Sequence, residues 1–125
     1  MLQSLFERNK VDPSAVDHVA GGCIAQVGEQ ANNVTRTAWL AAGLPLHVGA
    51  STTSTQCGSG QHANTWAHSL IGAGMADIVV VCGVESMSHV PMASQIPGKL
   101  LLLSFPLPLP IFAYQAGSFL PLGEI

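Results

Sequence analysis

Residues 48–83, VGASTTSTQCGSGQHANTWAHSLIGAGMADIVVVCG, indicate the fold class of this chain. The first part of this stretch, residues 48–55, is rich in β-branched and small side chains, which predicts a strand. Residues 78–82, IVVVC, form the continuous apolar run of a strand buried on both faces of a parallel sheet. The segment between them has helical periodicity. Strand, helix and strand in this order make a βαβ unit, so the predicted class is α/β.

The predicted helix follows a glycine-rich turn, CGSG at residues 57–60, and ends near Gly72. Its apolar side chains recur at helical spacing, so they share one side. They are Ala63, Trp66, Ala67, Leu70 and Ile71. We therefore expect a buried helix directly after the turn that carries Cys57.

Upstream of this unit, three short patterns predict further elements. Apolar side chains within residues 2–6 share a helical face. The dipeptide Asp-Pro at 12–13 is typical of a cap followed by a first-turn proline. Residues 18–24, HVAGGCI, predict a short buried strand that its glycines weaken.

A second helix is predicted over residues 30–42, because Gly43 and Pro45 directly after it are typical of a helix end. Its expected core-facing side chains are small or β-branched. They are Ala31, Val34, Ala38 and Ala41.

Length and charge limit the function classes. The chain has 125 residues, enough for one small domain with a core. It is 48% hydrophobic and only 9% charged, where about a quarter is usual. The net charge is −3, and the few Lys and Arg residues form no basic run. Nucleic acid is therefore not an expected partner.

The composition changes near residue 95. Residues 1–95 carry globular patterning, and residues 96–125 form a tail rich in Leu and Pro. The tail holds Pro97, Pro106, Pro108, Pro110 and Pro121. Proline interrupts helical hydrogen bonding. The uncharged run at 100–122 thus predicts an irregular, poorly ordered segment, and no membrane span is expected.

The cysteines, at positions 23, 57 and 82, form no C-x-x-C pair. An odd count at long spacing indicates neither a disulfide framework nor a zinc site. The first residues also lack the pattern of a secretory signal. We expect a reduced, cytoplasmic setting, with Cys23 and Cys82 inert inside apolar strands.

Cys57 is different, because it lies where a strand leads into a helix. The unpaired N–H groups and partial positive charge of a helix N-terminus favour a thiolate, the reactive form of cysteine. Gly58 and Gly60 have no side chains, so a thioester could approach the backbone closely. Spacing alone leaves two interpretations open, a nucleophile or a structural cysteine in a glycine-rich turn.

Three motifs in order resemble the thiolase family. CGSG at 57–60 resembles the motif around the acyl-accepting cysteine of thiolases, and CGVESMS at 82–88 resembles their G-G-x-E-S-M-S stretch. Upstream, QVGEQANNVTR at 26–36 is similar to the thiolase segment that leads into an early helix. The resemblance covers roughly residues 1–94.

The resemblance implies a fold and a chemistry. It implies part of the N-terminal half of a duplicated α/β fold with a mixed sheet, assembled as a homodimer or homotetramer. Acyl groups would pass between coenzyme A and an acyl-CoA, by cleavage of a 3-ketoacyl-CoA or condensation of acyl-CoAs. Cys57 would hold the acyl group beside Gly58 and Gly60, and its backbone N–H would stabilise an oxyanion. The coenzyme A thioester is the substrate, and no further cofactor or metal is implied.

The sequence also departs from the thiolase pattern. The G-H-P histidine and the second C-x-G cysteine of the family do not occur in these 125 residues. Thr53-Ser54 stands where thiolases usually have V-N or V-D. A nucleophile without its base is weak, so we expect this chain alone to be inactive. The alternatives are a non-catalytic fragment or binding module, and a ketoacyl synthase-like condensing enzyme.

Two further side chains, His62 and Glu85, are candidate proton acceptors. His62 lies five residues after Cys57, but a surface or capping histidine is the favoured interpretation. Glu85 follows a predicted buried strand and could act as a general base. The favoured interpretation of Glu85 is a structural carboxylate that accepts hydrogen bonds from nearby backbone N–H groups.

Overall fold

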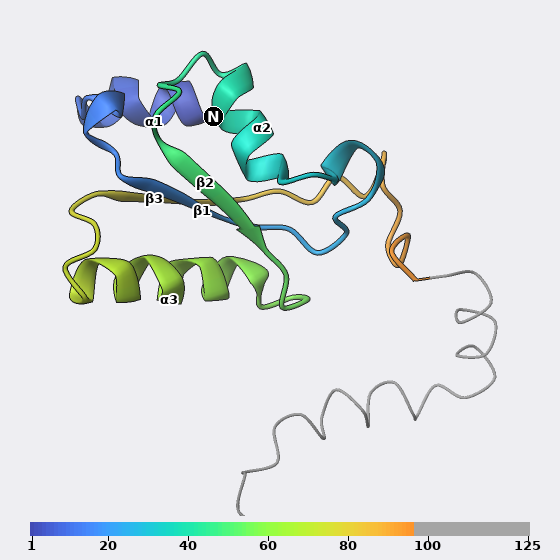
Figure 1. Cartoon of the computed structure of the whole chain (residues 1–125). Coiled ribbons are helices and arrows are strands. Elements are labelled where there is room, and N and C mark those ends of the chain that lie inside the picture. The colour runs from blue at the N-terminus through green and yellow to red at the C-terminus, as the bar shows by residue number, and fades with distance from the viewer. Residues whose placement is uncertain (97–125) are drawn as a thin grey trace, which may run out of the picture. The chain divides into compact units, whose positions relative to one another are not determined.

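The computed structural model describes residues 1–96 (Figure 1). The predicted tail, residues 97–125, lies outside the described residues, and the division near residue 95 stays a prediction. The elements in chain order are helix α1 (Leu2–Asn9), a 3₁₀ turn (Pro13–Ala15), strand β1 (His18–Gly22), a 3₁₀ turn (Gly28–Gln30), α2 (Val34–Ala41), β2 (Gly49–Thr53), α3 (Ser59–Gly72) and β3 (Val79–Gly83).

The strands form one sheet in the order β2-β1-β3, and every pairing is parallel. His18 pairs with Gly49 on one side and with Val79 on the other. The α/β class is confirmed, but a mixed sheet is wrong for residues 1–96. Each connection between successive strands contains a helix, α2 or α3, which returns the chain to the same end of the sheet and makes the next strand parallel.

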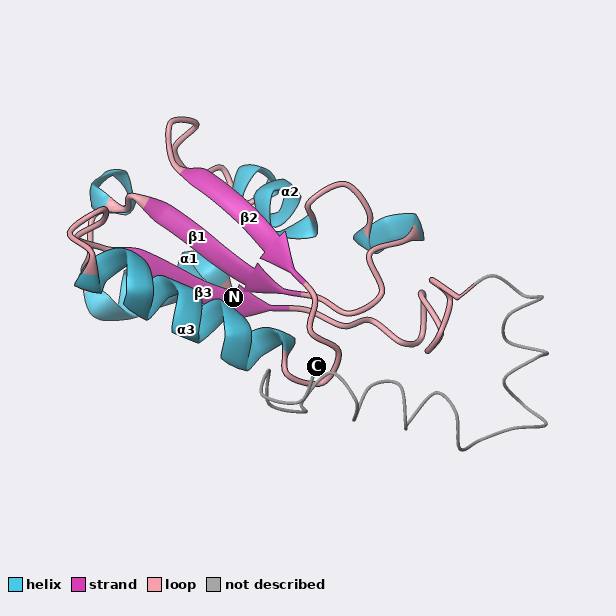
Figure 2. Cartoon of the chain, turned by 60° about the horizontal axis from the view of Figure 1, so that its bottom comes forward, coloured by secondary structure: helices cyan, strands magenta, loops and turns pink. Residues whose placement is uncertain are grey.

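Helices cover both faces of the sheet, α1 and α2 on one side and α3 on the other (Figures 1 and 2). The main hydrophobic core lies on the side of α1 and α2. It consists of Phe6, Val16, Val19, Trp39, Val48 and Val80. The rings of Phe6 and Trp39 meet edge to face at 5.7 Å, an arrangement that aromatic pairs favour.

The expected core face of α2 is wrong. The helix begins at Val34 rather than residue 30, because Asn33 caps it by accepting a hydrogen bond from the Arg36 N–H. Thr35 and Trp39 are its buried side chains, whereas Ala38 and Ala41 are exposed. Burial of the large Trp39 ring removes far more apolar area from water than burial of alanines, so it sets the orientation of the helix.

The helix after the turn is confirmed, and it is buried only in part. Ala63 and Ala67 are buried against the sheet, whereas Ile71 is 47% exposed. Trp66 is half-buried, and its ring meets that of His18 at 5.3 Å. The strand β3 is likewise not buried on both faces, since Val81 is 38% exposed. Among the described strands β3 is an outer one, which leaves it less covered than the central β1.

The helices within residues 1–96 are too short, or too polar, for any of them to cross a membrane.

Candidate active site

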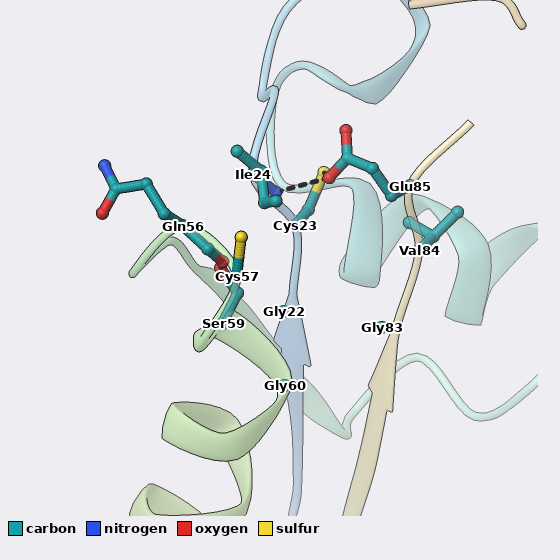
Figure 3. Close-up of a pocket in the computed structure, with 10 residues that line it drawn as sticks. All are labelled: Gly22, Cys23, Ile24, Gln56, Cys57, Ser59, Gly60, Gly83, Val84 and Glu85. Carbon is teal, nitrogen blue, oxygen red and sulfur yellow. Dashed lines mark hydrogen bonds between the residues drawn. The ribbon is translucent and has the colours of Figure 1, made fainter. Parts of the chain in front are cut away.

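A cavity of about 290 Å³ lies where the carboxyl ends of β1 and β3 meet the start of α3 (Figure 3). Sites in parallel α/β sheets usually lie beyond the carboxyl ends of the strands. The lining residues are Gly22, Cys23, Ile24, Gln56, Cys57, Ser59, Gly60, Gly83, Val84 and Glu85. Residues from three separate segments of the sequence thus come together around the predicted nucleophile.

Cys57 lies on the loop between β2 and α3, and it is the exposed one of the three cysteines. Just before it, Gln56 has a φ of 48°, in the left-handed region that non-glycine residues rarely adopt. The buried Ser59 hydroxyl holds this turn, because it accepts from the Thr55 N–H at 3.0 Å and donates to the Gln56 carbonyl at 2.5 Å. Ser59 was not identified from the sequence.

The predicted glycines of the site have different surroundings. A Cβ on Gly58 would lie 3.3 Å from the Thr55 carbonyl oxygen, whereas a Cβ on Gly60 would meet no atom within 4 Å. Among the glycines that line the cavity, Gly22 has the least room for a side chain, and it was not identified from the sequence. A Cβ there would lie 2.6 Å from the carbonyl carbon of Ser59. Glycine at this position lets the first turn of α3 contact β1 directly.

Glu85 closes one side of the cavity. Its carboxylate accepts hydrogen bonds from the N–H groups of Ile24 at 2.7 Å and Ala25 at 3.4 Å, and from the Gln30 amide at 3.0 Å. Desolvation raises the pKa of Glu85, but the hydrogen bonds from Gln30, Ile24 and Ala25 together outweigh it and hold the pKa below its usual range. These contacts agree with the structural carboxylate favoured from the sequence.

Gln30 connects the segments around Glu85. It is 3% exposed, and its amide nitrogen also donates to the Ala25 carbonyl at 2.9 Å. Its amide oxygen accepts from the Ser86 N–H at 2.5 Å. Gln30 was not identified from the sequence, because its partner Glu85 lies 55 residues away and no local pattern indicates the contact.

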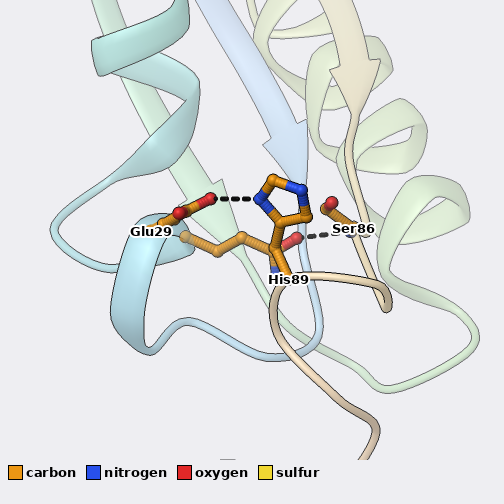
Figure 4. Close-up of polar contacts among 4 residues, drawn as sticks. Glu29, Ser86 and His89 are labelled. Atoms are coloured by element: carbon orange, nitrogen blue, oxygen red, sulfur yellow. Dashed lines mark hydrogen bonds and ion pairs between the residues drawn. The ribbon is translucent and has the colours of Figure 1, made fainter.

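Beyond Glu85, His89 fixes the following turn. Its ring nitrogen Nδ1 lies 2.8 Å from the Glu29 carboxylate, and its backbone N–H donates to the Ser86 carbonyl at 3.0 Å (Figure 4). Both side chains of the pair are exposed. Such surface pairs contribute only about 0–1 kcal/mol, so this contact positions the turn more than it stabilises the fold.

No histidine lines the Cys57 cavity within residues 1–96. His62 instead faces a separate hollow of about 430 Å³ with Trp66 and several hydroxyl side chains. The described residues also contain no group of His, Cys, Asp or Glu side chains suited to hold a metal ion.

The other two cysteines are in less accessible places. Cys23 is 1% exposed, and burial, followed by the charge of Glu85 and a hydrogen bond to it, raises the pKa of its thiol. Burial also raises the pKa of Cys82, which packs against the main core. Both environments disfavour a thiolate.

Comparison with known proteins decides the family. Residues 1–101 match the family described as the thiolase N-terminal domain. This chain belongs to the thiolase family. The match favours a thiolase over the ketoacyl synthase-like alternative.

Individual thiolases show the same relationship. A steroid 3-ketoacyl-CoA thiolase of Mycobacterium tuberculosis is 44% identical over 92 residues, 74% of this chain and 23% of that protein. A 3-ketoacyl-CoA thiolase of Aliivibrio salmonicida is 43% identical over 93 residues, covering 74% of this chain and 24% of its own length. This thiolase chain therefore spans about a quarter of the length of the curated relatives that it matches.

The fold agrees with that of a solved acetyl-CoA acetyltransferase. The crystal structure of a Bacillus anthracis acetyl-CoA acetyltransferase superimposes with a TM-score of 0.62 and 43% sequence identity. The superposition covers 70% of this chain and 22% of that one.

Proposed function

We propose that this chain is the nucleophile-bearing part of a thiolase-type acyltransferase, with Cys57 as the residue that accepts the acyl group. The observation that carries the proposal is the contrast among the three cysteines. Cys57 is exposed on a cavity at the start of α3, whereas Cys23 is buried and Cys82 is partly buried.

The proposed step begins with the Cys57 thiolate attacking the thioester carbonyl carbon of an acyl-CoA. A carbon–sulfur bond to Cys57 forms, the bond to coenzyme A breaks, and the released thiolate takes up a proton. The backbone N–H of Cys57, on the loop just before α3, and the positive end of the α3 helix dipole would stabilise the negative oxygen of the intermediate. Gly58 and Gly60 would leave room for the thioester beside this backbone.

With a 3-ketoacyl-CoA, the Cys57 thiolate would instead attack the ketone carbon, C3. The bond between C2 and C3 would break, and acetyl-CoA would leave as a C2 carbanion that must be protonated. That proton needs an acid, and no histidine lines the cavity within residues 1–96. We therefore propose that the 125-residue chain alone does not turn over acetoacetyl-CoA. We further propose that the active protein is a cytoplasmic homodimer or homotetramer, as the family resemblance implies.

Acetyl exchange with acetyl-CoA tests the nucleophile separately from turnover, because this half-reaction needs no proton donor at carbon. The native chain is incubated with acetyl-CoA, digested at acidic pH and mapped by mass spectrometry. We expect acetyl thioester on Cys57, none in a Cys57→Ala variant, and an unchanged amount in Cys82→Ser. Acetyl groups on Cys82, or none on Cys57 in folded protein, would favour a non-catalytic fragment.

A further inference from the structure

Cys57 shares its cavity with a second thiol. Cys23, directly after β1, lines the same cavity as Cys57 on the loop before α3 (Figure 3). Cys82 is not among the lining residues and packs against the main core. The fold thus brings two of the three cysteines, which are far apart in the sequence, to one site.

Backbone contacts fix these two segments against each other. The Cys23 N–H donates to the Thr53 carbonyl at 3.0 Å, and a Cβ on Gly22 would lie 2.6 Å from the Ser59 carbonyl carbon. Cys57 belongs to the loop between Thr53 and Ser59. The end of β1 is therefore held directly against the segment that carries Cys57.

The two thiols have contrasting environments. Cys57 is exposed, so it meets a dissolved oxidant first. Cys23 is 1% exposed, and its sulfur lies 3.9 Å from the Glu85 carboxylate. Burial and the charge of Glu85 raise the pKa of Cys23, which disfavours its thiolate and therefore its direct reaction with an oxidant.

We propose that Cys57 is a site of reversible oxidation by hydroperoxides, and that Cys23 resolves the oxidised form as an intramolecular disulfide. The Cys57 thiolate attacks a peroxide oxygen, the O–O bond breaks, and a sulfenic acid and water or an alcohol form after proton uptake. The Cys23 sulfur then attacks the Cys57 sulfur. An S–S bond forms, the S–O bond breaks, and the hydroxide leaves as water with the Cys23 proton.

This chemistry goes beyond acyl transfer, since it needs the thiol of Cys57 and no acyl-CoA. The disulfide would occupy the sulfur of the proposed nucleophile and protect it from irreversible oxidation to the sulfinic acid. A dithiol reductant would restore both thiols. The raised pKa of Cys23 lowers the fraction of this cysteine that is present as the thiolate near neutral pH. The disulfide should therefore form faster as the pH rises above neutral.

The test treats the native 125-residue chain with stoichiometric hydrogen peroxide, blocks the remaining thiols and maps peptides without reduction. We expect a Cys23–Cys57 linked peptide that dithiothreitol removes, and the same peptide in a Cys82→Ser variant. In Cys23→Ser, Cys57 should instead be trapped as sulfenic acid by dimedone, at least about tenfold more than in the unsubstituted chain.

Several results would overturn the proposal. These are linkage of Cys57 to Cys82, linkage of Cys57 mainly between chains, and equal dimedone trapping with and without Cys23. The same treatment in denaturant is the control for the fold, and an identical linkage pattern there would also count against it. Circular dichroism checks the folding of Cys23→Ser, and if that variant is unfolded, the peptide map of the unsubstituted chain decides alone.

Discussion

Gly22 lies where β1 meets the first turn of α3, and the absence of a side chain there allows the two backbones to approach closely. A Cβ at this position would lie 2.6 Å from the Ser59 carbonyl carbon and 2.7 Å from the Gly60 nitrogen. These atoms belong to backbone, which cannot rotate away as a flexible side chain can. The geometry of the site therefore depends on this glycine as well as on the cysteine itself.

We predict that Gly22→Ala destabilises the folded chain by about 1–3 kcal/mol, the usual cost of overpacking a filled interior. The free energy of unfolding is measured by urea titration. Gly60→Ala is the matched control, because a Cβ there would meet no atom within 4 Å. Gly60→Ala should leave the free energy of unfolding unchanged or raise it by about 0.5–1 kcal/mol, since alanine is a better helix former than glycine. An equal loss of unfolding free energy in both variants would show that β1 and α3 are not packed tightly at Gly22.

The loops that follow β1 and β3 are joined by Glu85 and Gln30. Glu85 accepts from the N–H groups of the loop after β1, and Gln30 bonds both loops. In the same region, the Ser54 hydroxyl donates to the Ile24 carbonyl at 3.4 Å, at a position where thiolases usually have Asn or Asp. The walls of the Cys57 cavity thus rest on polar contacts between elements.

We predict that Glu85→Gln lowers the free energy of unfolding near neutral pH by about 1 kcal/mol, through loss of hydrogen bonds to a charged acceptor. The lowered pKa of Glu85 means that its stabilisation is complete above the usual carboxyl range and is lost as the pH falls through the folded-state value. The difference from the unsubstituted chain should therefore shrink on acidification. Urea titrations at several pH values measure it.

Glu29→Gln is the control for this prediction. Glu29 lies in the neighbouring 3₁₀ turn and pairs with His89 in an exposed contact. Its substitution should change the free energy of unfolding by less than about 0.5 kcal/mol. A pH-independent loss in Glu85→Gln, or an equal loss in Glu29→Gln, would contradict the structural role of Glu85.

Local patterns were enough to predict the elements, because strands and helices follow from periodicity, caps and glycines along the chain. The sequence placed Cys57 correctly at the turn between β2 and α3. It did not predict which face of α2 is buried, because the buried face depends on the packing of Trp39 against Phe6 and the sheet. It also missed Gln30 and Gly22, whose importance lies entirely in contacts with residues far away in sequence.

Residues 1–96 form a three-stranded sheet in which β2 and β3 are the outer strands. Large apolar side chains are exposed around β3 and α3. They include Ile71 at 47%, Met75 at 75%, Ile78 at 36% and Val81 at 38%. Open strand edges and exposed apolar surface both favour association with other chains.

We therefore predict that the 125-residue chain is marginally stable alone and associates in solution. Its free energy of unfolding should fall below about 5 kcal/mol, the lower end for intact domains. Size-exclusion chromatography with light scattering and a denaturant titration measure both properties. A monodisperse monomer that unfolds cooperatively with more than about 8 kcal/mol would show that the described sheet needs no partner.

We propose Cys57 as the accessible, acyl-accepting thiol of this thiolase chain. Brief iodoacetamide labelling of the native protein, with and without acetyl-CoA, tests this role of Cys57. The labelled fraction of each cysteine is measured by mass spectrometry. We predict that Cys57 is alkylated at least about tenfold faster than Cys23 and Cys82, because thiolate character and access set the rate, and that acetyl-CoA protects Cys57 alone. Labelling of Cys23 or Cys82 as fast as Cys57 in folded protein, or no protection by acetyl-CoA, would contradict the claim.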